Sequence, residues 1–354
     1  MQPRNLSTFL LAALALPAVA LAQKGTAEYQ LTFQSTWSAA THPVQFPGNP
    51  HYSPLVGGTH TNNASFWMPG GLATAGIEQV AETGGTSGLV AEVSQQISQG
   101  NADQVLNFGS SGALSNSPGQ LTITFTADAD FSQLTLVTML APSPDWFLGV
   151  HGFDLIQNGD WVENAVIPLN LYDAGTDSGS SYTSANANMS PADPIALVTT
   201  TSGPFQGGSL MLGTFTLQRL SSSVVYGCSN PSGSMTVTGS AELGQNLQLS
   251  ISDPTGQMPL PAVSALAISA TPAGGFPCGT MLPGFGLANG TAGEVLLGGI
   301  DALMLGPTYS GSPAMVSLML PNTTGLVGQQ FYFQGLLASS RIGLTEGVAL
   351  RIGN

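Results

Sequence analysis

Positively charged residues are scarce in this sequence. Lys and Arg together number 5 in 354 residues, against 19 Asp and Glu, so the formal net charge at pH 7 is −14. A surface with this excess of negative charge repels phosphate backbones and anionic membranes. The composition therefore excludes direct nucleic-acid binding, and it opposes binding to polyanions unless a cation bridges the contact.

Cysteine is equally rare, because the chain contains only Cys228 and Cys278. In an exported protein, one disulfide between them is the natural expectation. Closing a loop of about 50 residues contributes roughly 4 kcal/mol to stability in the chain-entropy treatment. The alternative, two free thiols or half of a metal site, lacks a nearby His partner.

Long apolar runs are absent after the first residues of the chain. Residues 1–22 combine Arg4, the apolar stretch Phe9–Leu16 and the small residues Ala20-Leu-Ala22 before Gln23. This order predicts a secretory signal peptide, whereas a membrane anchor needs about 20 apolar residues and is opposed by Pro17. We expect no transmembrane segment in the mature chain and a secreted location, whether extracellular, periplasmic or at the cell surface.

Residues 23–222 show the pattern of an all-β domain. Tyr29, Leu31 and Phe33 alternate with polar neighbours, which is typical of a strand with one buried face. Further strands are predicted at 121–125, 134–140, 147–153, 165–171 and 209–220. Residues 75–82 and 87–99 are predicted as short helices, and 41–60 as a loop that holds three of the four His residues. An antiparallel β-sandwich with two minor helices is the expected fold.

The polar stretch Ser221–Ser223 is predicted to be a linker to a second domain over residues 223–354. Short strands are expected there at 246–251, 263–269, 315–320, 329–334 and 348–352, separated by Gly- and Pro-rich turns. The sequence thus predicts a smaller C-terminal β-sandwich that carries the disulfide.

Three carboxylates gather among turn-forming residues between Ala141 and Gly179, a stretch without Lys or Arg. Asp145 lies before one predicted strand, and Asp173 and Asp177 follow another. Clustered carboxylates repel one another unless a cation lies among them, and oxygen ligands suit Ca²⁺. The competing interpretation is that such residues only form turns. The nearby Asp154, Asp160 and Glu163 are expected to be solvated.

Several ordered motifs carry a resemblance to a known family. They are Leu31-Thr-Phe-Gln-Ser-Thr-Trp37, Thr41-His-Pro43, His51-Tyr-Ser-Pro-Leu55, Pro69-Gly-Gly71, Gln79-Val-Ala-Glu82, Ala141-Pro-Ser-Pro-Asp-Trp146 and Asp173-Ala-Gly-Thr-Asp-Ser-Gly179. Together they resemble the spondin N-terminal domain family over about residues 27–220. The resemblance implies a sandwich similar to that of synaptotagmin, with Ca²⁺ held by Asp145, Asp173 and Asp177. This chain differs from animal members of the family because it has no cysteine between Asp154 and Trp161.

Two other functions compete with calcium-dependent adhesion. An extracellular hydrolase could use paired carboxylates, with Asp145 beside Trp146 as the candidate acid, but the chain has no GxSxG, HExxH or phosphate-binding loop. A calcium-dependent carbohydrate-binding module could stack sugars on the four tryptophans, which are Trp37, Trp67, Trp146 and Trp161, although core packing is their commoner role. We expect a non-enzymatic, calcium-binding adhesion or recognition protein whose partner is an extracellular protein or glycan.

Overall fold

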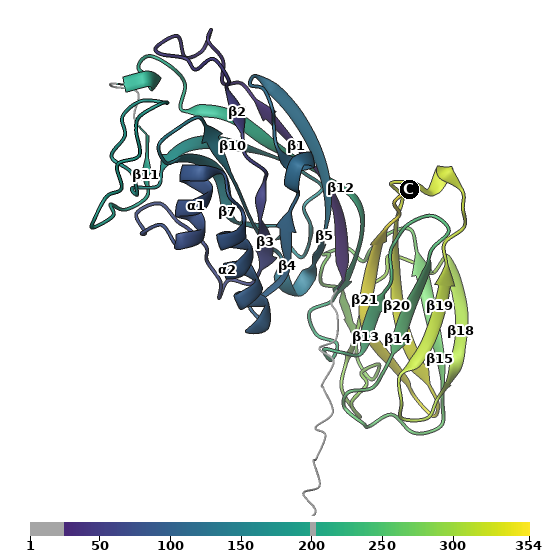
Figure 1. Cartoon of the computed structure of the whole chain (residues 1–354). Coiled ribbons are helices and arrows are strands. Elements are labelled where there is room, and N and C mark those ends of the chain that lie inside the picture. Colours follow the sequence, from purple (N-terminus) through teal and green to yellow (C-terminus); the bar gives the residue numbers. More distant parts are fainter. Residues whose placement is uncertain (1–24, 199–202) are drawn as a thin grey trace, which may run out of the picture.

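The computed structural model describes residues 25–198 and 203–354, which form two lobes (Figure 1). The predicted signal peptide, residues 1–22, lies outside these ranges. The first lobe (residues 25–221) contains the helices α1 (Ala75–Thr83) and α2 (Ser87–Ser98). Its strands are β1 (Thr26–Ser35), β2 (His51–Tyr52), β3 (Val56–His60), β4 (Ala102–Asn107), β5 (Gly119–Asp128), β6 (Gln133–Ala141), β7 (Trp146–Asp154), β8 (Ile156–Gln157), β9 (Asp160–Trp161), β10 (Asn164–Asp173) and β11 (Ala196–Leu197).

Strand β12 (Met211–Tyr226) runs from the first lobe into the second (residues 222–354). The second lobe contains β13 (Met235–Thr238), β14 (Asn246–Ile251), β15 (Ala262–Ser269), β16 (Thr280–Leu282), β17 (Gly293–Val295), β18 (Ala302–Tyr309), β19 (Ala314–Met319), β20 (Gln330–Ala338) and β21 (Ile342–Arg351). The predicted all-β fold with two helices is confirmed, and the strand predictions in both halves match observed strands. No helix of the described ranges is long and apolar enough to cross a membrane.

The first lobe is a sandwich of two antiparallel layers. One layer contains β5, β1, β12 and the first part of β10, and the other contains the end of β10 with β7, β6, β3 and β4. Alternate side chains of β1 point into the core between the layers, where Tyr29, Leu31 and Phe33 are fully buried. Helices α1 and α2 cover the outer face of the second layer (Figure 1), burying Ile77 and Leu89. Strand β10 thus belongs to both layers and ends beside β7.

The segment predicted as a loop over residues 41–60 is only partly a loop. Strand β3 lies inside it and pairs with both β4 and β6. Its Val-Gly-Gly-Thr-His sequence has weak β propensity, which is why the strand was missed, as was β4. A side chain at Gly57 would collide with the carbonyl oxygen of Thr135 on β6, so glycine permits the close approach of these strands.

The predicted linker Ser221–Ser223 is wrong as a description of this segment. All three serines lie in β12 and are buried. Residues 221 and 222 pair with β1, while 222–226 pair with β21 of the second lobe, so the ladder of backbone hydrogen bonds continues across the junction. The polar composition misled the prediction because pairing on both sides satisfies the backbone here.

The second lobe packs two sheets around its own core. The sheet β18-β15-β20-β21 faces the three-stranded sheet β13-β14-β19, and Leu249, Leu266 and Leu337 are fully buried between them.

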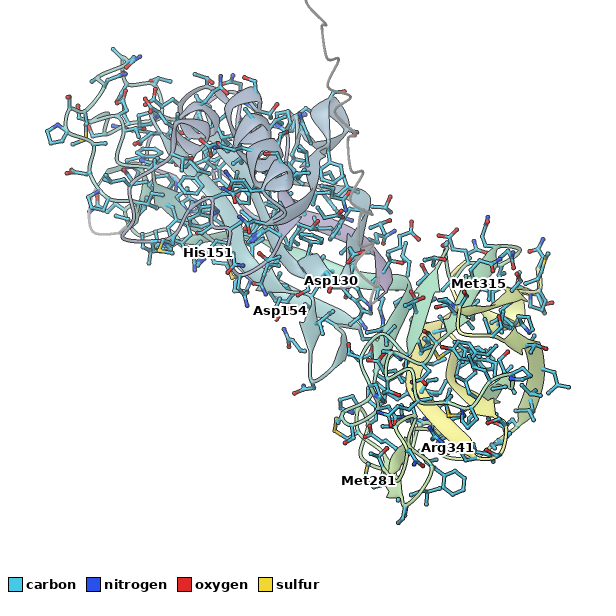
Figure 2. All side chains as sticks on the ribbon, turned by 90° about the horizontal axis from the view of Figure 1, so that it is seen from below. Asp130, His151, Asp154, Met281, Met315 and Arg341 are labelled. Carbon is cyan, nitrogen blue, oxygen red and sulfur yellow. A yellow bond between two sulfur atoms is a disulfide. The ribbon has the colours of Figure 1, made fainter. Side chains whose placement is uncertain are left out.

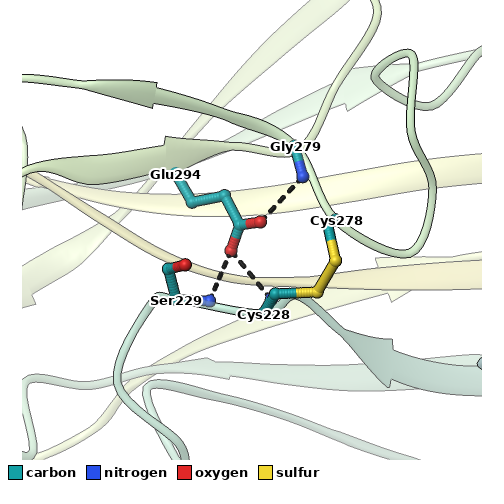
Figure 3. Close-up of a disulfide and its surroundings, with 5 residues drawn as sticks. All are labelled: Cys228, Ser229, Cys278, Gly279 and Glu294. Carbon is teal, nitrogen blue, oxygen red and sulfur yellow. Dashed lines mark hydrogen bonds between the residues drawn. A yellow bond between two sulfur atoms is a disulfide. The ribbon is translucent and has the colours of Figure 1, made fainter.

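The predicted disulfide between Cys228 and Cys278 is present. Beside it, the buried carboxylate of Glu294 accepts backbone N–H bonds from Cys228 (2.8 Å), Ser229 (2.7 Å) and Gly279 (2.7 Å) (Figure 3). Burial alone would raise the pKa of Glu294, but these donors outweigh it and lower the pKa.

An ion-pair network joins the lobes. The Arg219 guanidinium, only 3% exposed, contacts Asp160 (Nη1 to Oδ1, 3.0 Å) and Glu163 (Nη2 to Oε2, 2.7 Å). The second oxygen of Glu163 contacts Nη2 of Arg351 on β21 at 2.7 Å. The expectation that Asp160 and Glu163 are solvated holds only in part, because their side chains stay 25% and 44% exposed while the folded chain also pairs them with two of its few guanidinium groups.

Glu163→Gln should lower the free energy of unfolding by about 1 kcal/mol, between the values typical of exposed and buried pairs. The change removes the negative charge that pairs with both Arg219 and Arg351, although Arg219 keeps its ion pair with Asp160. Urea unfolding measures the effect, and the loss should shrink in high salt because exposed pairs are screened. Glu78→Gln is the control, since it removes one negative charge from α1 without touching a guanidinium. Equal stability of the Glu163→Gln protein and the parent at low salt would contradict a stabilising role.

Candidate functional site

The three predicted aspartates lie at one end of the first-lobe sandwich. Asp173 is the last residue of β10 and pairs in register with Trp146, the first residue of β7. Asp145 directly precedes Trp146, so antiparallel pairing places the two loops that follow β6 and β10 side by side. The backbone carbonyl of Asp145 accepts the N–H of Ala174 at 3.1 Å, which fixes one loop to the other.

Asp145 is fully buried, and its two carboxylate oxygens differ in their hydrogen bonding. Its Oδ2 accepts the backbone N–H groups of Thr176 (2.8 Å) and Asp177 (3.1 Å). Its Oδ1 is buried and has no hydrogen-bond partner among the described residues. Burial and the neighbouring Asp173 raise the pKa of Asp145 to about 6, although the two N–H bonds oppose the rise. A buried carboxylate oxygen without a hydrogen-bond partner destabilises the folded state unless a proton or a cation binds to it.

The other two aspartates organise their own loop. Asp173 Oδ1 accepts the Gly175 N–H (2.9 Å), and its Oδ2 accepts Nε1 of the Trp146 indole (3.1 Å). Burial raises the pKa of Asp173, and Asp193 and Asp177 add to the rise. Asp177 accepts the N–H groups of Gly179 (2.6 Å) and Ala187 (2.7 Å).

Gly175 explains part of the Asp-Ala-Gly-Thr-Asp motif. Its φ is +73°, a conformation that glycine adopts without strain. A side chain here would also collide with the carbonyl oxygen of Asp193. The chain can therefore turn sharply enough after Asp173 to bring the N–H groups of Thr176 and Asp177 to Asp145.

No guanidinium of the described residues offsets this cluster. The described Arg residues are all bonded elsewhere: Arg219 and Arg351 in the inter-lobe network, and Arg341 to backbone carbonyls of the second lobe. The three aspartates do not, however, bring one oxygen each within 4.8 Å of one another. The only His, Cys, Asp or Glu group that does so in residues 25–198 and 203–354 is Cys228, Cys278 and Glu294, where the sulfurs are already bonded to each other.

A fourth carboxylate, which the sequence analysis did not select, lies next to the cluster. Glu82 of α1 and Asp177 both line a polar cavity of about 140 Å³. One Glu82 oxygen is buried without a hydrogen-bond partner in the described part of the chain, and burial raises the pKa of Glu82. Glu82 is 63 residues from Asp145 in the sequence, so no local spacing could have linked them.

All four tryptophans are buried, with exposed fractions of 4% or less. Trp146 packs against Tyr182 and Phe205, with ring centroids 5.7 and 4.8 Å apart. Trp37 donates its indole N–H to the Tyr182 hydroxyl at 3.3 Å. These rings are core residues and offer no exposed face on which a sugar could stack.

Comparison with known proteins matches the first lobe to one family. The profile of the Spondin_N family matches residues 27–207. Spondin-1 of Gallus gallus is 37% identical over 202 residues, which cover 53% of this chain and 25% of the relative. Spondin-1 of Homo sapiens is 36% identical over 188 residues, covering 51% of this chain and 23% of the relative. Spondin-2 of Homo sapiens is 32% identical over 183 residues, covering 51% of this chain and 54% of the relative.

The matched region spans about a quarter of the length of the Spondin-1 relatives and about half of Spondin-2. The relatives are secreted proteins, which confirms the secreted location predicted for this chain. Because the profile matches more than half of the chain and coincides with the sandwich lobe that contains the three aspartates, the chain belongs to the spondin N-terminal domain family.

Proposed function

We propose that this protein is a calcium-binding adhesion or recognition protein, in which Asp145, Asp173 and Asp177 hold Ca²⁺. The observation that carries the proposal is the buried Oδ1 of Asp145, which has no hydrogen-bond partner among the described residues, in a cluster that none of the described guanidinium groups contacts. An all-oxygen set of carboxylates is the donor chemistry that Ca²⁺ prefers. The donor chemistry therefore suits Ca²⁺, although the three carboxylates must draw closer together to share one ion.

When bound, the ion would supply positive charge to the carboxylates and open coordination positions to an external ligand. The protein's own part is to hold the two loops together. Asp145 receives the N–H groups of residues 176 and 177 on one oxygen, which leaves the other oxygen for a cation. Asp173 also lines an open cavity of about 350 Å³ together with Leu197 and Phe205, a route by which a partner could reach the site.

The partner in this proposal is an extracellular protein or glycan that offers oxygen ligands. A carbohydrate-binding module is the second candidate. Because the four indole rings are buried, a sugar could bind only through the cation and would have no aromatic surface on which to stack. The raised pKa of Asp145 favours a hydrolase, because a general acid needs such a shift. Its complete burial opposes contact with a substrate, so binding without catalysis is the better supported function.

Calcium titration of the full chain tests the proposal directly. We expect a calorimetric heat, a rise in Tm, and a change in tryptophan fluorescence because Trp146 donates to Asp173. Calcium at about 100 times its Kd should stabilise the fold by about 2.7 kcal/mol. Asp173→Asn should weaken binding at least about tenfold, a loss of ~1.4 kcal/mol, because it removes one of three charged ligands.

Asp154→Asn is the matched control for this titration. Asp154 lies at the opposite end of β7, on the side toward the second lobe (Figure 2), and accepts hydrogen bonds from Ser132 and Ile156 that an Asn oxygen can also accept. Its affinity for calcium should equal that of the parent. Absence of both heat and a Tm shift at millimolar Ca²⁺ would refute the metal site.

In chelator, Asp145→Asn should be more stable than the parent at pH 7. Because the folded pKa of about 6 exceeds the ordinary value of 3.8, the contribution of Asp145 to stability is largest below pH 4 and is lost as the pH rises to 6. The Asn variant avoids this loss, which amounts to about 2–3 kcal/mol, and its carbonyl oxygen can still accept the two N–H bonds. Melting curves from pH 4 to 7 measure the difference, which should close near pH 4. A variant that melts lower than the parent throughout would show that no uncompensated charge is buried there.

A further inference from the structure

The second lobe contains an apolar cavity of about 310 Å³ that the calcium proposal does not use. Its floor is the outer face of the sheet, where Ala267 of β15, Leu336 of β20 and Leu344 of β21 lie on neighbouring strands. The segment around β16 and β17 provides the facing wall, including Phe285 and Leu297. The cavity therefore lies between a rigid sheet and a short hairpin.

Hydrogen bonds from Arg341 hold the segment that forms the facing wall of the cavity. Arg341, next to Ile342 at the cavity, donates to the backbone carbonyls of Gly286 and Leu287 at 2.6 and 2.5 Å. In Figure 2, Arg341 lies toward the same side of the second lobe as Met281, on the hairpin, and away from Met315. The guanidinium thus fixes the loop after Phe285 through polar bonds, while the Phe285 side chain lines the cavity.

The cavity offers an occupant almost no polar partner. Gln334 is its one polar lining side chain, and that amide is fully used: Oε1 accepts the Leu296 N–H (3.0 Å), and Nε2 donates to the carbonyls of Glu294 (2.7 Å) and Thr345 (2.9 Å). None of the described charged residues lines the cavity. A sugar, a peptide backbone or an ion would lose its hydration without replacement, so these classes of ligand are disfavoured.

Apolar side chains are also exposed at the cavity mouth. Ile300 is 67% exposed and Ile342 is 42% exposed, and both line the cavity. Most exposed large apolar side chains of the described residues lie in this lobe, which has only five Asp or Glu and two Arg after residue 226. Exposed apolar patches that surround a cavity commonly mark a binding site.

We propose that this cavity binds the hydrocarbon chain of a single-chain amphiphile, with the polar head outside in water. The cavity complements such a chain in charge and in hydrogen bonding, because neither partner leaves a polar group unsatisfied. This function is separate from the calcium site, so removing calcium should leave it unchanged.

Binding of straight-chain alkanols from hexanol to dodecanol to the full two-lobed chain tests the proposal by calorimetry. Affinity should rise about fourfold per added methylene, the factor that corresponds to ~0.8 kcal/mol, and then level off once the cavity is filled. Binding should saturate at one site per chain. Ile300→Asp should weaken it at least about tenfold, because a charge at the mouth must be desolvated when the chain enters.

Two controls separate the cavity from other apolar surfaces. Val166→Asp changes a residue of nearly the same exposure as Ile300, 68% against 67%, on β10 of the first lobe. Leu305→Asp changes a 75% exposed residue of β18 that does not line the cavity. Both should bind within about twofold of the parent. Equal losses in Leu305→Asp and Ile300→Asp, or absence of saturation, would overturn the proposal in favour of adsorption to an open surface. A dimer that excludes alkanols and is lost in Ile300→Asp would overturn it in favour of a second copy of the chain.

Discussion

Backbone hydrogen bonding along β12 is the constraint on which both lobes depend. In the first lobe β12 pairs with β1 on one side and β10 on the other, and its last residues pair with β21. It therefore fixes where β10 runs, and β10 in turn brings Asp173 beside Trp146. The position of the candidate calcium site is thus a consequence of strand register in a ladder that begins far from the aspartates.

Much of the fold could be predicted because alternation of apolar and polar residues reports local burial. Tyr29, Leu31 and Phe33 alternate and are buried as expected. The same reasoning fails where the determining interaction lies outside the segment. Gly57 reads as a loop residue, but its lack of a side chain allows β3 to approach β6. Arg219 lies 56 residues from Glu163, so only the folded chain shows that they form an ion pair.

The sequence alone brought the three aspartates to attention, but it carried no information on their electrostatics. Acid residues among turn formers, without basic neighbours, singled out Asp145, Asp173 and Asp177, and the family resemblance favoured a calcium site over simple turns. Only the structure shows that Asp145 uses one oxygen to bind the opposite loop, while its other oxygen has no partner in the described part of the chain. Glu82 belongs to one of the family motifs, but its proximity to Asp177 could not be predicted because α1 is far from the aspartates in the sequence. The second-lobe cavity was missed for a similar reason, since three strands and a hairpin combine to form it.

The continuity of β12 also bears on where this protein can be divided. The family match ends at residue 207, before β12 begins at Met211. A chain cut after residue 207 would lack Phe215 and Leu217, which are fully buried, and would leave β1 and β10 as unpaired edges. Such edges promote aggregation. The smallest part of the chain that can fold alone is therefore longer than the region matched by the family profile. The boundary of the matched family sequence and the boundary of the folding unit do not coincide in this protein.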